Sequence, residues 1–293
     1  MLCIDSLTHK LGNKTVLKDV SLTVHDSGIM GIVGINGAGK TTLLRLLAGV
    51  YIPDSGSITY DGQHPTDPKV RQGIFFLPDE PYYTAHSTPD SIFEFYKTFY
   101  PNADKEQYHK ILKIYGIEGN EAMRNFSKGM RRQTFVALAL ALKPRYLLLD
   151  EAFDGLDPLA RKVFKEHIAA LVDQSGTGVL ISSHSLRELE DFCDSFVLID
   201  DHTVKSYGDI SEHVERLCKF ELAFTHTVTN EFFADIPACS VNVRGKFATV
   251  VMEGEPEKCM ELLRSLSPVI MDQVAVDFEE AFIHDVNKDR GVL

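Results

Sequence analysis

The chain has 293 residues, of which 44% are hydrophobic and 25% are charged, and its formal net charge is −12. This balance is typical of a globular protein and excludes the disordered and fibrous classes. The acidic charge excludes a general electrostatic grip on nucleic acid, which needs a basic face, so we expect no nucleic-acid partner. It leaves open the binding of a small polyphosphate, because that depends on a local site.

The sequence predicts a cytoplasmic protein that does not cross a membrane by itself. Its longest uncharged apolar run covers only residues 135–142, whereas a spanning helix needs about 20 residues. Residues 1–5 have neither the basic nor the apolar region of a signal peptide. The five cysteines are scattered and never form a Cys-x-x-Cys pair, which indicates reduced thiols without a disulfide framework or a zinc site.

Short apolar runs alternate with helical patterns over the first two thirds of the chain. Strands are predicted over residues 16–24, 29–33, 58–60, 146–149 and 179–183. Helices are predicted over residues 42–47, 135–142, 158–173 and 186–192, the last one opened by Ser185 in a capping-box pattern. Strands and helices in this order predict an α/β fold, with a mostly parallel sheet covered by helices on both faces.

The stretch between residues 91 and 115 has a helical pattern with a break at Pro101. Aromatic side chains gather here and just before it: Phe75, Phe76, Tyr82, Tyr83, Phe93, Phe95, Tyr96, Phe99 and Tyr100. We expect most of them to form the core of a small subdomain and a few to be exposed. The alternative is a groove for a partner, since aromatic side chains are enriched at interface hot spots.

The composition changes near residues 208–215, which indicates a second domain. Beyond this point, residues 220–225 and 248–252 are predicted strands and residues 256–265 a predicted helix. We therefore expect a large domain over residues 1–212 and a small α+β accessory domain over residues 213–293.

One glycine-rich segment fits the pattern G-x-x-x-x-G-K-[ST] of a phosphate-binding loop. It follows an apolar strand, precedes a helix, and consists of Gly34, Ile35, Asn36, Gly37, Ala38, Gly39, Lys40 and Thr41. Glycines let successive backbone N–H groups surround an anion, and the helix N-terminus adds partial positive charge. Lys40 is expected to reach the terminal phosphates and the Thr41 hydroxyl to ligate Mg²⁺.

Two carboxylates, Asp150 and Glu151, follow the buried strand over residues 146–149. Ligands of open α/β sheets bind at the carboxyl ends of the strands. Asp150 is therefore expected to hold Mg²⁺ through water, and Glu151 to polarise the water that attacks the γ-phosphate. His184 follows the strand over residues 179–183 at the same edge, where its imidazole can hydrogen-bond a phosphate.

Two further segments start helices. Ser127 is an N-cap candidate for a helix over residues 131–142, and Gly129 permits a close approach of the backbone to a phosphate. Asp157 and Pro158 fit the N-cap and first position of the next helix. Taken alone, each segment predicts only an ordinary helix start.

Together and in this order, these segments resemble the ATP-binding subunit of ABC transporters over residues 1–210. Residues 34–41 look like Walker A, residues 147–151 like Walker B with its catalytic glutamate, and residues 155–157 like the D-loop. Residues 126–130 are similar to the family signature in an SKGM form, and His184 to the switch histidine. The SKGM form and residues 276–282 look like the exporter-type subunits that pair with ABC-2-like permeases.

The resemblance implies a P-loop NTPase fold with a β-rich amino-terminal subdomain and a helical subdomain over residues 87–143. It implies ATP and Mg²⁺ as cofactors and catalysis by Lys40, Glu151 and His184. It also implies that Thr41, Asp79 and Asp150 ligate the metal ion. The nucleotide would contact the Walker A residues and, in addition, Thr42, Leu11, Ser127, Gly129 and Asp157.

The resemblance also implies two kinds of partner. A second ATP-binding subunit, identical or different, would pair head to tail with this one, and a polytopic permease would hold both at the inner face of the cell membrane. Two alternatives remain: a soluble ABC-type ATPase without a permease, and a nucleotide-sensing module without turnover.

The sequence departs from the family pattern at two positions. Leu11 stands where members usually carry an aromatic residue that stacks on adenine, so stacking worth roughly 0.5–1.5 kcal/mol is lost. After a strand like residues 73–77, the family's Q-loop glutamine aligns with Asp79, or alternatively with Glu80. The departure at Leu11 bears on base selectivity and on affinity for nucleotide. An anionic Asp79 can still approach Mg²⁺, but it adds negative charge near the γ-phosphate.

Overall fold

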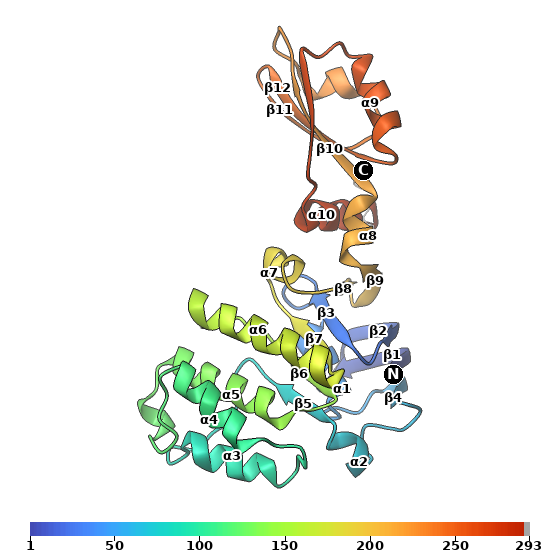
Figure 1. Cartoon of the computed structure of the whole chain (residues 1–293). Coiled ribbons are helices and arrows are strands. Elements are labelled where there is room, and N and C mark those ends of the chain that lie inside the picture. The colour runs from blue at the N-terminus through green and yellow to red at the C-terminus, as the bar shows by residue number, and fades with distance from the viewer. Residues whose placement is uncertain (290–293) are drawn as a thin grey trace. The chain divides into compact units, whose positions relative to one another are not determined.

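The computed structural model describes residues 1–289. The chain divides into two compact units, Met1–Tyr207 and a second unit that begins at Gly208 (Figure 1). The boundary predicted between residues 212 and 213 lies slightly later, inside helix α8 (Ile210–Glu215). The assignment of the second unit as an accessory domain stays a prediction.

A six-stranded sheet forms the centre of the first unit. Its strands lie in the order β5 (Ile74–Leu77), β6 (Tyr146–Leu149), β7 (Gly178–Ser182), β3 (Gly28–Val33), β8 (Ser195–Asp200) and β9 (Thr203–Asp209). The five strands from β5 to β8 run parallel, and every residue of β6 and β7 is buried. Continuous apolar strands of this kind need cover on both faces. The predicted α/β fold with a mostly parallel sheet is confirmed.

A smaller antiparallel sheet completes the β-rich part. It contains β2 (Lys14–Val24), β1 (Leu2–Leu11) and β4 (Ser55–Tyr60) in that order. Its inward-facing side chains share one hydrophobic core with α1 (Lys40–Leu47) and the large sheet; this core includes Leu2, Leu7, Val20, Leu43, Ile58 and Leu148. The short helix α2 (Pro68–Arg71) follows β4.

Helices α3 (Pro89–Lys97), α4 (Lys105–Ile114) and α5 (Lys128–Leu142) pack together as a helical subdomain, in green in Figure 1. A 3-10 turn, η1 (Met123–Asn125), precedes α5. Of the nine aromatic residues at positions 75–100, two are buried and three are clearly exposed: Tyr82, Phe95 and Phe99. The other four are partly buried. Helices α6 (Pro158–Ser175) and α7 (Leu186–Glu190) follow β6 and β7.

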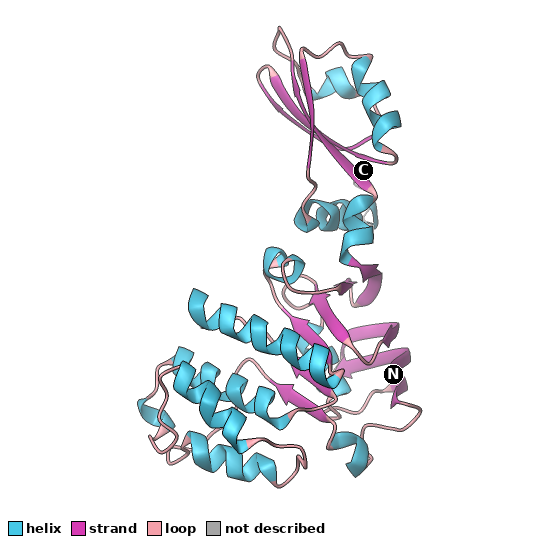
Figure 2. Ribbon diagram, viewed as in Figure 1, coloured by secondary structure: helices cyan, strands magenta, loops and turns pink. Residues whose placement is uncertain are grey.

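The second unit is an α+β arrangement of its own (Figure 2). Its antiparallel sheet has the order β11 (Ala238–Arg244), β12 (Phe247–Glu253), β10 (Leu217–Ala223) and β13 (Ile270–Val274). Phe220 and Val250 of the sheet pack with Leu263 of α9 (Pro256–Arg264) in one core. The 3-10 turn η2 (Asn230–Phe233) and α10 (Phe278–Asp289) complete it. Among the helices of residues 1–289, none has the length and apolar character needed to cross a bilayer.

Candidate active site

The glycine-rich loop joins β3 to α1, as the sequence predicts. Ile35, Asn36 and Gly37 are exposed, whereas Ala38, Lys40 and Thr42 are buried. The ammonium of Lys40 donates hydrogen bonds to the loop's own carbonyl oxygens, that of Gly34 at 2.7 Å and that of Ile35 at 3.5 Å. The Lys40 side chain therefore curls over the loop in the structure.

Two glycines of this loop have no room for a side chain. At Gly39 (φ +114°), a Cβ would lie 2.8 Å from Leu17 Cδ2 and 2.9 Å from the Val16 carbonyl oxygen. At Gly34, a Cβ would lie 2.5 Å from the Ile199 carbonyl oxygen. The loop can therefore curve tightly before α1, with its amide groups and the helix N-terminus available to an anion.

Thr41 and Asp150 meet beside this loop although they are far apart in the chain. The Thr41 hydroxyl donates to Asp150 Oδ1 at 3.0 Å, and the Ser182 hydroxyl donates to the same oxygen at 2.8 Å. Asp150 follows β6 and Ser182 ends β7, so the adjacent parallel strands bring them to one sheet edge. Hydroxyl and carboxylate oxygens are suitable ligands for Mg²⁺, so Thr41 and Asp150 fit this ion.

Glu151 and His184 form a second pair at the same edge. The backbone N–H of His184 donates to Glu151 Oε2 at 3.2 Å, and His184 Nδ1 lies 3.0 Å from that oxygen. Asp154 Oδ1 lies 3.9 Å from Nδ1. The hydrogen bond with Glu151 is the main cause that raises the pKa of His184 above its ordinary value.

The ammonium of Lys40 interacts electrostatically with the carboxylates of Glu151 and Asp150. Burial lowers the pKa of its ammonium, while the charges of Glu151 and Asp150 oppose this shift. A cationic donor, a hydroxyl and two carboxylates thus surround the end of the glycine-rich loop. Such a set suits the binding of a polyphosphate with a divalent ion and the activation of a water.

Comparison with known proteins places the chain in a family. Residues 17–154 match the family described as ABC transporter. The ABC transporter ATP-binding protein YtrB of Bacillus subtilis (strain 168) is 31% identical over 285 residues, which are 97% of each chain. The chain belongs to the ATP-binding subunits of ABC transporters. Members of this family hydrolyse ATP, so the chain is an ABC-type ATPase.

Other relatives and solved structures agree with this membership. The lipopolysaccharide export system ATP-binding protein LptB of Haemophilus influenzae is 32% identical over 209 residues, covering 68% of this chain and 86% of that protein. A solved ATP-binding subunit of an ABC transporter, 26% identical, has a TM-score of 0.67 over 73% of this chain and 92% of its own. A dimeric ATP-binding cassette in a post-hydrolysis state, bound to ADP and Pi, shares the fold. It is 22% identical, and the match has a TM-score of 0.63 and covers 71% of this chain and 98% of its own.

The segment that resembles the family signature, residues 126–130, lies at the start of α5. Ser127 caps this helix, and its exposed hydroxyl accepts a hydrogen bond from the Met130 N–H at 3.1 Å. A Cβ at Gly129 would lie 2.8 Å from the Gly155 carbonyl oxygen. The predicted signature and the predicted D-loop of one chain are therefore neighbours, and glycine at 129 permits their close approach. Contact of Ser127 and Gly129 with a nucleotide stays a prediction.

Asp157 is the N-cap of α6, as predicted, and Pro158 is the first residue of that helix. The Asp157 side chain accepts a hydrogen bond from the Ala160 N–H at 2.9 Å. This hydrogen bond accounts for aspartate at position 157 through its role as a helix cap. Contact of Asp157 with a nucleotide stays a prediction.

Leu11 and Asp79, the two departures from the ABC pattern, take no part in the hydrogen bonds that join Thr41, Asp150, Glu151 and His184. Leu11 ends β1 and is 46% exposed, before a left-handed Gly12, so its side chain is available to a ligand. Asp79 follows β5, and in the described residues 1–289 its backbone carbonyl accepts from Arg132 while its carboxylate forms no hydrogen bond with Thr41 or Asp150. Metal ligation by Asp79 and base contact by Leu11 stay predictions.

Three residues that contact Asp150, Glu151 or His184 were not predicted from the sequence. Ser182 contacts both carboxylate-bearing residues, since its hydroxyl also accepts a hydrogen bond from the Glu151 N–H at 3.0 Å. Asp154 lies beside His184, and Arg132 donates to backbone carbonyls next to Glu151. Only Ser182 carries a local signal, a polar side chain at the end of a buried strand.

Proposed function

We propose that this chain is the ATPase subunit of an exporter-like transporter, which closes head to tail on a second ATP-binding subunit and drives a separate membrane permease. The observation that carries the proposal is the convergence of Lys40, Thr41, Asp150, Glu151 and His184 at one sheet edge. The kinship with an ATP-binding protein of a lipopolysaccharide export system supports the exporter-like class.

In this proposal the phosphate chain of ATP lies against the amide groups of residues 34–41, and Lys40 exchanges its carbonyl partners for the terminal phosphates. Thr41 and Asp150 would hold Mg²⁺, which neutralises charge on the β- and γ-phosphates when bound. Glu151 accepts a proton from the attacking water. His184 orients the Glu151 carboxylate and donates a hydrogen bond toward the γ-phosphate.

The site of one chain would be completed by the signature of another. Ser127 is exposed at the N-terminus of α5, where the helix dipole favours a bound anion. The shared fold of a cassette that is dimeric with ADP and Pi supports this arrangement. Two ATP molecules would then join the dimer, and hydrolysis would release it, because the phosphate charge that matches the two surfaces is lost.

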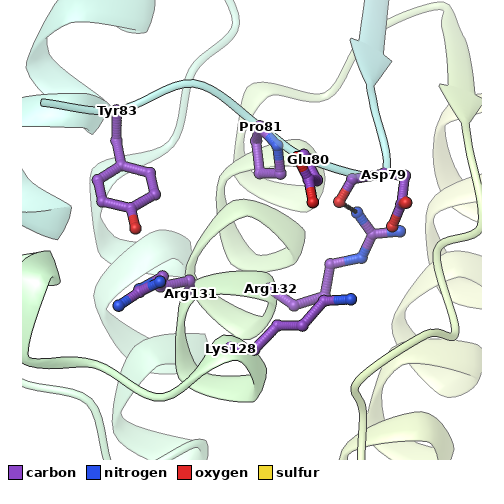
Figure 3. A pocket seen from close by; sticks show the side chains of 7 residues that line it. All are labelled: Asp79, Glu80, Pro81, Tyr83, Lys128, Arg131 and Arg132. Atoms are coloured by element: carbon purple, nitrogen blue, oxygen red, sulfur yellow. Dashed lines mark hydrogen bonds between the residues drawn. The ribbon is translucent and has the colours of Figure 1, made fainter.

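A pocket beside the Asp79 loop is our proposed contact for the permease (Figure 3). Its volume is about 370 Å³, and it is lined by Asp79, Glu80, Pro81, Tyr83, Lys128, Arg131 and Arg132. Arg131 stacks on the Tyr83 ring, with its guanidinium carbon 5.3 Å from the ring centre. Tyr82, next to this pocket in the chain, is 85% exposed, a character suited to a protein contact.

The experiment is purification of the tagged chain from detergent-solubilised membranes, followed by an ATPase assay with and without the material bound to it. The proposal predicts a polytopic membrane protein in stoichiometric amount and a change in ATPase rate on its removal. Recovery of an active ATPase without a membrane partner would favour the soluble alternative. Absence of phosphate release would favour the sensing module, which the departures at Leu11 and Asp79 motivate.

A further inference from the structure

Arg132 has a charged side chain in a buried place. It lies in the first turns of α5, and only 3% of its surface is exposed. Figure 3 shows the side chain extending from the helix toward Asp79. Its Nη1 donates to the carbonyl oxygens of Pro78 at 2.8 Å and of Asp79 at 2.9 Å. One half of the guanidinium is thus bound to the loop after β5.

The other half reaches the residues that follow β6. Nη2 donates to the carbonyl oxygens of Asp150, at 2.7 Å, and of Glu151, and Nε donates to that of Ala152 at 3.4 Å. A guanidinium has five N–H donors in one rigid plane. All of them find a backbone carbonyl here, so Arg132 joins the loop after β5 to the loop after β6.

The backbone of Glu151 needs such support. Its φ of 48° lies in the left-handed region, which residues other than glycine seldom adopt and which persists only where neighbours hold it. The N–H of Glu151 donates to Ser182 Oγ, and its carbonyl accepts from Arg132. Arg132 and Ser182 thus both hold the backbone from which the Glu151 side chain projects.

We propose that Arg132 is a positioning residue for ATP hydrolysis, which fixes the backbone of Glu151, and with it the carboxylate, relative to the loop that carries Asp79. The inference rests on the proposed role of Glu151 and adds a residue to it. Because α5 begins at the signature, a shift of this helix would reach Glu151 directly through the guanidinium.

The test compares steady-state ATP hydrolysis and nucleotide affinity of the full-length chain with those of Arg132→Lys and Arg132→Gln. Lysine keeps the charge but offers three donors on a flexible stem, so it cannot bind all five carbonyls. We expect kcat to fall roughly 10- to 100-fold in both variants, while KM and the nucleotide Kd change little.

Arg145→Gln is the matched control. Arg145 precedes β6 at the end opposite Asp150, where it forms ion pairs with Asp26 and Asp61. This control removes an arginine with structural contacts in the same unit, so we expect a lower unfolding temperature and an unchanged kcat. Thermal unfolding of every variant separates a loss of folding from a loss of positioning.

A double variant shows whether Arg132 acts through Glu151. We expect Arg132→Lys to have no further effect on the residual rate of Glu151→Gln, because the carboxylate that it positions is gone. The inference is overturned if either Arg132 variant keeps the wild-type kcat, if the two losses multiply, or if kcat falls only together with nucleotide affinity and folding. If Glu151→Gln itself keeps full turnover, the proposed role of Glu151 fails instead.

Discussion

His184 Nδ1 and Glu151 Oε2 lie 3.0 Å apart, and the backbone N–H of His184 donates to the same carboxylate oxygen. Glu151 follows β6 and His184 comes after the end of β7, two strands that are neighbours in the sheet. His184 is therefore a hydrogen-bond partner of the residue that we propose as the base, and Glu151 raises the pKa of its imidazole. This electrostatic effect can be measured in solution.

The first prediction concerns this pair. The pKa of His184 is raised by Glu151, so replacing that residue by glutamine lowers it toward the ordinary value of 6.5. The ion pair stabilises the fold fully below pH 6.5, and this stabilisation is lost as the pH rises through the raised pKa of the folded state. An NMR titration of the His184 ring in wild type and Glu151→Gln measures the shift. Glu166→Gln, an exposed carboxylate on α6, serves as the control, and an equal His184 pKa in all three proteins would contradict the prediction.

The second prediction concerns turnover. Glu151→Gln keeps the size of the side chain but cannot accept a proton, so ATP still binds and hydrolysis nearly stops. We expect the variant to elute as a dimer in the presence of ATP and Mg²⁺, since the complex no longer resolves by hydrolysis. Phosphate release and size-exclusion chromatography measure the two effects. Unchanged turnover would remove Glu151 as the base.

The third prediction uses mixed subunits to test the head-to-tail arrangement. Lys40→Ala disables the loop of one chain, and Ser127→Arg blocks the signature of another. In a mixed dimer, one site combines the intact Lys40 with the intact Ser127, and the other site combines both defects. We expect one occluded nucleotide per mixed dimer and none in a dimer of either parent. If each site were built within a single chain, every site in the mixture would carry one of the two defects and would stay empty.

The fourth prediction concerns the nucleotide base. Leu11 is exposed at the end of β1, so Leu11→Tyr adds an aromatic face without disturbing the core. Stacking worth about 0.5–1.5 kcal/mol corresponds to a roughly 2- to 13-fold tighter Kd for ATP. Fluorescence titration measures the change, with the exposed Leu262→Tyr of the second unit as control. If Leu11→Tyr and Leu262→Tyr bind ATP equally well, the adenine does not contact residue 11.

Much of the fold is predictable from local signals. The strands β3, β6 and β7 are unbroken apolar runs, and α6 begins at an Asp-Pro pair that caps it, so their predicted positions agree closely with the structure. Strand β1 is less visible in the sequence. Ser6 has a φ of 49°, and the register of β1 against β2 shifts between Ile4 and Leu7, so the apolar alternation is interrupted.

The site is predictable only where one segment carries its chemistry. The glycine-rich loop and the Asp150-Glu151 pair are each a contiguous pattern, and a parallel sheet brings them to one edge. Arg132 gives no such signal, because its five acceptors are backbone carbonyls of two distant loops. Any residue type can supply a carbonyl oxygen, so only the folded chain reveals this contact.

The central claim is that the phosphates of ATP lie on the loop at Lys40, with a divalent ion between them and Asp150. Crystals of Glu151→Gln grown with ATP and Mn²⁺ in place of Mg²⁺ test it through anomalous scattering. We predict one manganese peak next to Thr41 Oγ1 and the Asp150 carboxylate, with the phosphate chain along residues 34–41 and Lys40 on its terminal phosphates. Ordered ATP elsewhere on the chain, or a manganese peak distant from Thr41 and Asp150, would contradict the account.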